Sequence, residues 1–241
     1  GIPPHHPFFT ATTAANVPVW GDVELCWHVD KASLCGPSRV WLAVTGTNGK
    51  TTTVGMTTAI CQQAGMSAVA CGNIGYPIEE ALLDPNHPDV LVCELSSFQL
   101  HLAPSVKPLA GALLNIDEDH LDWHGSVEAY AADKTRVLNG LYAIVGLDDP
   151  RAAAAGDECS AQFVIGFRAG EPVRGQIGVH ENGLFDNAFG PNDAARFLIE
   201  CADIHPAGPA GVLDAGAAAA LAMAAGAMPQ DVNDALKDFV V

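Results

Sequence analysis

The segment from Trp41 to Thr53 constrains the fold of this chain more than any other. It reads Trp-Leu-Ala-Val-Thr-Gly-Thr-Asn-Gly-Lys-Thr-Thr-Thr, an apolar stretch followed by a glycine-bracketed turn and the start of a helical pattern. A buried strand that leads through a glycine turn straight into a helix is typical of open α/β sheets. The segment therefore predicts an α/β protein in which this strand, turn and helix are contiguous.

The turn has the residue types that a phosphate-binding loop needs. Its two glycines let the backbone approach an anion and turn N–H groups inward, and the helix N-terminus adds partial positive charge. Lys50 supplies a charge for the outer phosphates, and Thr51 offers a hydroxyl to a magnesium ion. We therefore predict a nucleotide-binding loop made of Gly46, Thr47, Asn48, Gly49, Lys50, Thr51 and Thr52.

The spacing of this loop departs from that of the general P-loop. Gly-x-x-x-x-Gly-Lys would place a glycine at position 44, where the chain has Val44. We interpret the loop as a compact variant. The alternative is an ordinary Gly/Asn turn before a helix, which the flanking strand and helix make less favourable.

Composition limits the class of protein. The 241 residues are 49% hydrophobic and 16% charged, which is typical of a globular protein with a substantial core. No apolar run approaches the ~20 residues of a membrane-spanning helix, so we expect no membrane span. The net charge of −17 excludes generic nucleic-acid binding. Seven irregularly spaced cysteines without a secretory signal predict free thiols, and we expect a cytoplasmic monomer.

Strand and helix patterns alternate from residue 39 onward. Residues 1–38 are rich in Pro, His and Thr, and only 17–20 and 23–27 look like short strands. The chain begins with Gly1 and not Met, so we expect a piece of a longer protein. We predict a mostly parallel P-loop-type sheet with helices on both faces and an antiparallel edge ribbon over 175–189. The expected strands are 40–45, 67–71, 89–94, 109–115, 142–146 and 161–167, and the expected helices are 50–64, 76–83, 126–139, 212–225 and 229–238.

Polar side chains follow several of these strands, at the sheet edge where ligands collect. Glu94 ends one strand and can reach a magnesium ion beside the phosphates, although an acid that caps a helix is the alternative. The run from Asn115 to His124 is dense in oxygen and imidazole ligands and predicts a second cation. A zinc pair of His120 and His124 is the less favourable interpretation, because carboxylates beside a phosphate loop favour magnesium.

Lys134 follows this acidic run on the next predicted helix. Taken alone, it would be a surface charge. A lysine that loses its proton near metal ions can instead add carbon dioxide and become an anionic carbamate. The spacing by itself does not decide between these two interpretations.

Five motifs together resemble the Mur ligases in order and separation across residues 40–140. They are Gly46-Thr-Asn-Gly-Lys-Thr-Thr-Thr53, Gly72-Asn-Ile-Gly-Tyr-Pro77, Glu94-Leu-Ser-Ser-Phe-Gln-Leu100, Asn115-Ile-Asp-Glu-Asp-His-Leu-Asp122 and Tyr130-x-x-x-Lys134. The third motif favours the member that adds D-glutamate. The resemblance implies ATP and two Mg²⁺ ions as cofactors, with UDP-MurNAc-L-alanine and D-glutamate as substrates joined through an acyl phosphate.

The resemblance also implies a domain plan and site residues. Residues 1–38 would end a UDP-substrate-binding domain, 39–241 would be the central ATP-binding domain, and a C-terminal amino-acid-binding domain would be absent. Magnesium would be held by Thr51, Glu94, His120 and carbamylated Lys134. Glu94, His120 and Lys134 would act in catalysis with Lys50. The muramoyl-alanine portion would be faced by Asn73, Ser96 and Gln99.

One departure concerns the nucleotide base. Many relatives carry a His-Asn pair and another Asn before the alanine-rich helix, and only Asp214 is polar in the corresponding stretch here. We therefore expect weakened base specificity. The alternatives to a ligase that adds D-glutamate are another Mur ligase, a folylpolyglutamate-type ligase, or a nucleotide-binding module without amide chemistry. We also expect this chain alone to bind nucleotide without turnover.

Overall fold

The computed structural model describes residues 2–191 and 194–240. In these residues the strands form one nine-stranded sheet in the order β2-β3-β1-β4-β5-β6-β7-β8-β9. Pairing is parallel from β2 through β7 and antiparallel for β7–β8 and β8–β9. The strands are β1 (Val40–Thr45), β2 (Ala68–Gly72), β3 (Val90–Glu94), β4 (Ala110–Leu113), β5 (Tyr142–Gly146), β6 (Phe163–Arg168), β7 (Gln176–His180), β8 (Gly183–Asp186) and β9 (Arg196–Glu200). This confirms the predicted sheet and its antiparallel edge.

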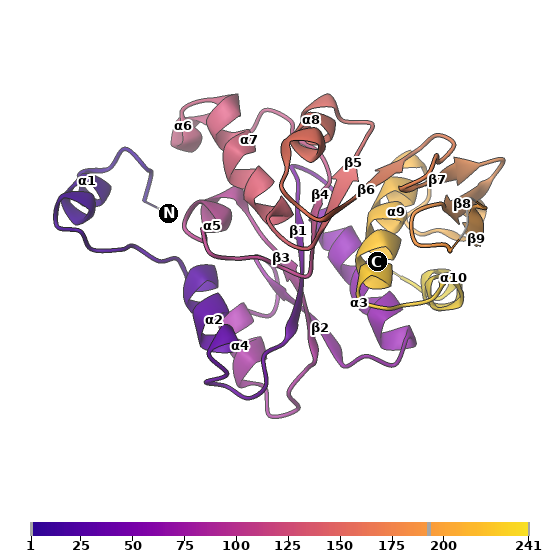
Figure 1. Ribbon diagram of the computed structural model, residues 1–241, viewed down its shortest axis with the longest axis horizontal. Helices are drawn as coiled ribbons and strands as arrows, with labels where there is room; N and C mark the ends of the chain where they lie inside the picture. The colour runs from indigo at the N-terminus through magenta and orange to yellow at the C-terminus, as the bar shows by residue number, and fades with distance from the viewer. Residues whose placement is uncertain (1, 192–193, 241) are drawn as a thin grey trace.

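Helices cover both faces of the sheet (Figure 1). One face packs against α3 (Lys50–Gln63), α9 (Pro209–Ala224) and α10 (Pro229–Lys237). The other face packs against α2 (Asp22–Lys31), α4 (Ile78–Leu83), α5 (Ser97–His101), α7 (Val127–Thr135) and α8 (Pro150–Glu158). Strand β1 contributes to both cores, with Leu42 and Val44 on the first and Trp41 and Ala43 on the second.

The position of β1 inside the sheet decides where a ligand can bind. Strand β1 pairs with β3 on one side and with β4 on the other. The strands that follow β1 in the chain therefore lie on both sides of it, with β2 and β3 on one side and β4 and β5 on the other. The strand order reverses at β1, so its carboxyl end is the switch point of the sheet. The glycine loop follows β1 directly.

Several elements differ from the sequence predictions. Residues 23–27 lie in helix α2 and not in a strand, and 17–20 lie outside the helices and strands. The alternation in Val-Glu-Leu-Cys-Trp resembles a strand, but a helix buries Val23, Cys26 and Asp30 on one side. Helix α1 (Pro7–Ala14) has no buried residue and lies apart from the sheet (Figure 1). The prediction also missed α5, α6 (Leu121–His124), α8 and β9.

The alanine-rich helix α9 is buried along most of its length and packs closely on α3. A methyl group at Gly216 would lie 3.5 Å from Phe167 Cβ and 3.8 Å from Ile177 Cγ2, which are ordinary contacts. Gly216→Ala should therefore raise the free energy of unfolding by about 0.5–1 kcal/mol, because alanine restricts the unfolded chain and favours the helix. Urea unfolding of both proteins measures the change.

Gly111→Ala is the matched contrast for this prediction. A methyl group there would collide with the carbonyl oxygen of Val137, so this variant should be destabilised. A Gly216→Ala protein that is less stable than the parent would show that α9 tolerates no added volume.

Two further expectations concern the whole chain. All seven cysteines are free thiols, as predicted. Within residues 2–191 and 194–240, every helix is too short or too polar to cross a membrane.

Candidate active site

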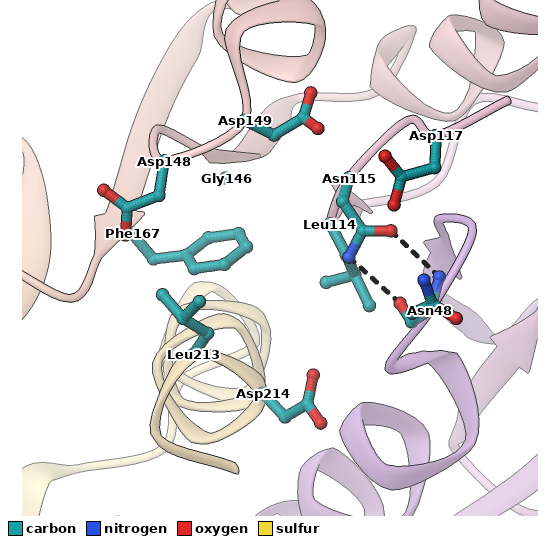
Figure 2. A pocket seen from close by; sticks show the side chains of 10 residues that line it. All are labelled: Asn48, Leu114, Asn115, Asp117, Gly146, Asp148, Asp149, Phe167, Leu213 and Asp214. Carbon is teal, nitrogen blue, oxygen red and sulfur yellow. Dashed lines mark hydrogen bonds between the residues drawn. The ribbon is translucent and has the colours of Figure 1, made fainter. Parts of the chain in front are cut away.

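The glycine loop connects β1 to α3 and is hydrogen-bonded to the segment that follows β4. Thr47 N donates to Asn115 O at 3.1 Å, and Asn48 N donates to Asn115 Oδ1 at 2.9 Å. Asn115 Nδ2 donates back to Asn48 O at 3.2 Å, so its amide pairs with both backbone groups of Asn48 (Figure 2). The sequence motif contained Asn115, but nothing in the sequence indicated this clamp.

Gly49 must be glycine for two independent reasons. Its φ is +85°, in the left-handed region, and a Cβ atom there would collide with the carboxylate of Asp214. Lys50 begins α3 and donates from Nζ to Gly46 O and Thr47 O, both at 3.0 Å. The lysine therefore lies over the loop, while Thr51 and Thr52 follow in the first turn of α3.

Thr51 and Glu94 lie together beside this loop. Thr51 Oγ1 donates to Glu94 Oε2 at 2.8 Å, and Asn73 Nδ2 donates to Glu94 Oε1 at 3.1 Å. Glu94 is 2% exposed. The helix-cap alternative for Glu94 is wrong, because Ser96 caps α5. A buried carboxylate that receives hydrogen bonds from neutral groups, next to a threonine hydroxyl and a phosphate loop, fits a magnesium ion.

A cavity of about 140 Å³ lies on the same side of the loop. It is lined by the loop and by residues from four other segments: Gly46, Thr47, Lys50, Asn73, Ser96, Ser97, Phe98, Asp119, His120, Tyr130 and Lys134. The structure thus gathers most of the predicted catalytic and substrate residues around one space. Glu94 and Thr51 are not among the lining residues, and Glu94 reaches this cavity through its hydrogen bond from Asn73.

Lys134 is 2% exposed, so its interpretation as a surface charge is wrong. Its Nζ donates to Gly46 O at 2.9 Å and to Thr45 Oγ1 at 3.4 Å, and it lies 4.8 Å from the centre of the Tyr130 ring. Burial, with the charge of Lys50, lowers the pKa of Lys134 from 10.5 to about 7, while Asp119 and Glu94 oppose the shift. A large fraction of this lysine is therefore a free amine near neutral pH, which is the form that reacts with carbon dioxide.

The two histidines of the acidic run separate in the structure. His120 is half-exposed and lies 3.4 Å from Asp119 through its Nε2. His124 is buried and bonds to Ser97 and Asp133 instead. Across the described part of the chain, no three His, Cys, Asp or Glu side chains are placed to hold a metal ion. A zinc pair of His120 and His124 therefore has no support from this geometry, and a second cation would need ligands other than these four residue types.

Ser96 and Gln99 form a capping box at the start of α5. Gln99 N donates to Ser96 Oγ at 3.3 Å, and Ser96 N donates to Gln99 Oε1 at 3.0 Å. Gln99 Nε2 donates to Asp22 Oδ2 at 3.2 Å. Ser96 and Asn73 line the small cavity, whereas Gln99 is not among its lining residues. A substrate contact of Gln99 stays a prediction.

A larger cavity of about 250 Å³ lies on the other side of the loop (Figure 2). Apolar side chains of Leu114, Phe167 and Leu213 form part of its wall. Its other lining residues are Asn48, Asn115, Asp117, Gly146, Asp148, Asp149 and Asp214. The sequence predicted nucleotide binding for Asn48 and Asp214, and it predicted cation ligands in the run that contains Asn115 and Asp117, but it gave no ligand role to the other lining residues. The signal it missed is that Gly146 and Phe167 lie at the carboxyl ends of β5 and β6.

Asp214 lies in α9 and accepts a hydrogen bond from Thr53 Oγ1 at 3.3 Å. Burial raises its pKa from 3.8 to about 6, and the bond from Thr53 opposes the shift. Because the folded-state pKa is raised, the charged form destabilises the fold above about pH 6, and this penalty disappears below about pH 4.

Asp214→Asn should therefore stabilise the protein by about 2–3 kcal/mol at pH 8 and change its stability little at pH 4. The measurement is urea unfolding of both proteins across this pH range. Asp238→Asn, at an exposed position, removes the same charge and is the matched control. An equal gain for Asp214→Asn at both pH values would contradict the assignment.

The fold, the loop and the cavities on either side of it are typical of a nucleotide-binding domain of the P-loop type. Residues 44–190 match the family model of the Mur ligase middle domain, and the chain belongs to the Mur ligase family. It is 53% identical over its whole length to the UDP-N-acetylmuramoylalanine--D-glutamate ligase of Nocardia farcinica and 54% to that of Mycolicibacterium vanbaalenii. The chain spans about half the length of these curated relatives, 50% and 49%.

Solved structures of other Mur ligases share the fold. A UDP-N-acetylmuramoyl-L-alanyl-D-glutamate--2,6-diaminopimelate ligase superimposes with a TM-score of 0.68 at 20% identity, over 91% of this chain and 50% of that one. The MurF ligase of Thermotoga maritima in complex with ADP gives a TM-score of 0.62 at 18% identity, over 91% of this chain and 52% of that one.

Proposed function

We propose that this chain is the nucleotide-binding part of a ligase that uses ATP to join D-glutamate to UDP-MurNAc-L-alanine. The observation that carries the proposal is the Thr51–Glu94 contact at 2.8 Å beside a phosphate loop with a cavity on each side. The relatives named above support the choice of substrates. Residues 1–38 would belong to the end of the UDP-substrate domain and 39–241 to the central domain.

The two cavities would divide the substrates between them. The cavity of about 250 Å³ has apolar walls suited to the base of ATP, and the loop would hold the phosphates. The substrate carboxylate would enter the cavity of about 140 Å³, where Lys50 and the magnesium ions would offer positive charge. Weak base specificity stays a prediction, since it depends on what Asp214 contributes to the larger cavity.

The reaction would have two steps. The substrate carboxylate attacks the γ-phosphoryl group of ATP, and ADP leaves as the acyl phosphate forms. The amine of D-glutamate then attacks the acyl carbon, loses a proton and displaces phosphate to form the amide. Positioning and charge neutralisation dominate phosphoryl transfer, and Lys50 with the N-terminus of α3 would supply both.

Magnesium ions would be held by Thr51 and Glu94 at one site and by His120 and carbamylated Lys134 at a second. Bound magnesium neutralises negative charge on the phosphates. The Thr51–Glu94 pair fits this role as it stands, and Lys134 would fit after carbamylation, because an ammonium group binds no cation.

Phosphate release by the full-length protein tests the proposal. With ATP, Mg²⁺ and UDP-MurNAc-L-alanine, release should require D-glutamate and not L-glutamate, L-lysine or D-alanyl-D-alanine. Release with a folate substrate and L-glutamate would favour the folylpolyglutamate-type alternative. ATP binding without release in any mixture would favour a binding module.

Turnover is expected from the full-length protein only, because this chain spans about half the length of its relatives. The chain alone should bind Mg-ATP and release no phosphate.

A further inference from the structure

His124 connects two segments that both line the small cavity. Its Nε2 lies 2.9 Å from Ser97 Oγ at the start of α5, and its Nδ1 lies 3.1 Å from Asp133 Oδ2 in α7. Its side chain is 1% exposed. Ser97 follows β3, which ends in Glu94, and Asp133 precedes Lys134. The imidazole thus bridges the segments that carry two proposed magnesium-holding groups.

The chemistry of the two partners selects one form of the ring. An ionised Asp133 can only accept hydrogen bonds, so His124 Nδ1 must carry a proton. In a neutral imidazole Nε2 is then an acceptor, and the Ser97 hydroxyl donates to it. Burial lowers the pKa of His124, with His101 and His120 adding to the shift and Asp133 opposing it, which favours the neutral ring. The Ser97 oxygen is left as an acceptor toward the cavity that it lines.

Aromatic packing holds the ring in this orientation. Phe98 stacks on His124 with ring centres 5.5 Å apart and an angle of 14°. Trp123 and Tyr130 meet it at 66° and 68°, with centres 4.5 Å and 5.2 Å away. A ring packed on three sides and bonded at both nitrogens has one arrangement available.

We propose that His124, as a neutral imidazole with its proton on Nδ1, is a positioning residue that ties the segment after β3 to α7 and thereby holds Lys134 against the phosphate loop. The link to Lys134 is short in the chain, because Asp133 is its neighbour and Lys134 Nζ donates to Gly46 O at 2.9 Å. This role deepens the proposed function and depends on it for its effect on turnover.

The test compares variants of the full-length protein. His124→Phe keeps a ring against Phe98 and loses both hydrogen bonds, and His124→Asn keeps an amide near the Nδ1 position only. We expect kcat to fall about 10- to 100-fold in His124→Phe while KM for ATP stays within about twofold, because Lys134 is misplaced while the loop remains intact. His124→Asn should retain more of kcat, since one of the two links survives.

The matched control is His101→Phe. His101 Nδ1 also bonds to Asp133, at 2.9 Å, but its side chain is 25% exposed and does not bond to Ser97. This variant should keep kcat within about twofold. If kcat fell as much in His101→Phe as in His124→Phe, the proposal would be overturned, because loss of any contact to Asp133 would then be enough to lower kcat. An unchanged kcat in His124→Phe would also overturn it.

Two readouts do not depend on turnover. Nitrogen-15 NMR of this chain at pH 7.5, with the His124 signal assigned from the spectrum of His124→Phe, should show Nδ1 protonated and Nε2 unprotonated. Exposed neutral histidines favour the opposite tautomer, so a proton on Nε2 would refute the bridge. In unfolding, Ser97→Ala and His124→Phe should be non-additive, whereas additive effects would contradict the bond.

These readouts separate two failures. A wild-type protein without ligase activity would refute the proposed function, while the tautomer and the non-additivity would still decide whether His124 forms the bridge.

Discussion

Lys50→Ala should weaken Mg-ATP binding by this chain about 100-fold or more. Its ammonium group lies over the loop, with Nζ 3.0 Å from Gly46 O and 3.0 Å from Thr47 O, where it would meet the outer phosphates. Loss of a charge-assisted contact of this kind costs about 1.5–3 kcal/mol, and contact with more than one phosphate oxygen would place the effect at the upper end. Isothermal titration calorimetry measures the affinity directly.

Two controls make this result interpretable. Lys107→Ala removes an exposed lysine far from the loop in sequence and should leave the affinity unchanged. The thermal unfolding of Lys50→Ala should stay close to that of the parent, since the side chain contacts only loop carbonyls. An unchanged affinity in a folded Lys50→Ala protein would remove the phosphate-loop assignment.

Lys134→Ala should abolish amide formation by the full-length protein, with a loss of about 1,000-fold or more in kcat if one charged group of the transition-state environment is removed. The structure supplies the reason, since Lys134 is buried against Gly46 and its pKa is lowered to about 7. Lys134→Glu should restore part of kcat, because a carboxylate can replace the anion of a carbamate.

Further measurements separate a carbamate from a simple charge. Mass spectrometry after trapping of carbamates should show the added carbon dioxide on Lys134, and removal of bicarbonate should lower the activity of the parent and not that of Lys134→Glu. Full activity in Lys134→Ala would exclude Lys134 from the reaction. Lys134→Arg, which keeps a positive charge and cannot form a carbamate, should be as inactive as Lys134→Ala.

Local sequence was sufficient for the parts of this protein that depend on neighbouring residues. The apolar run of β1, the glycines of the loop and the helix that starts at Lys50 lie within thirteen consecutive positions, and the structure has them as predicted. The wrong predictions also came from patterns in neighbouring residues. The alternating pattern at 23–27 indicated a strand, and the tertiary contacts of α2 with α4 and α5 selected a helix.

The alternation of strands and helices, the loop and the five motifs were therefore determined by the sequence, because each rests on residue type and on spacing along the chain. Only the tertiary structure decided that Lys134 is buried beside a loop 88 residues away, that Asp214 packs on Gly49 and Thr53, and that Asn115 clamps Asn48. Burial shifts the pKa of both Lys134 and Asp214, the charge of Lys50 adds to the first shift, and the hydrogen bond from Thr53 opposes the second. Each of these effects depends on contacts between segments that are distant in the chain.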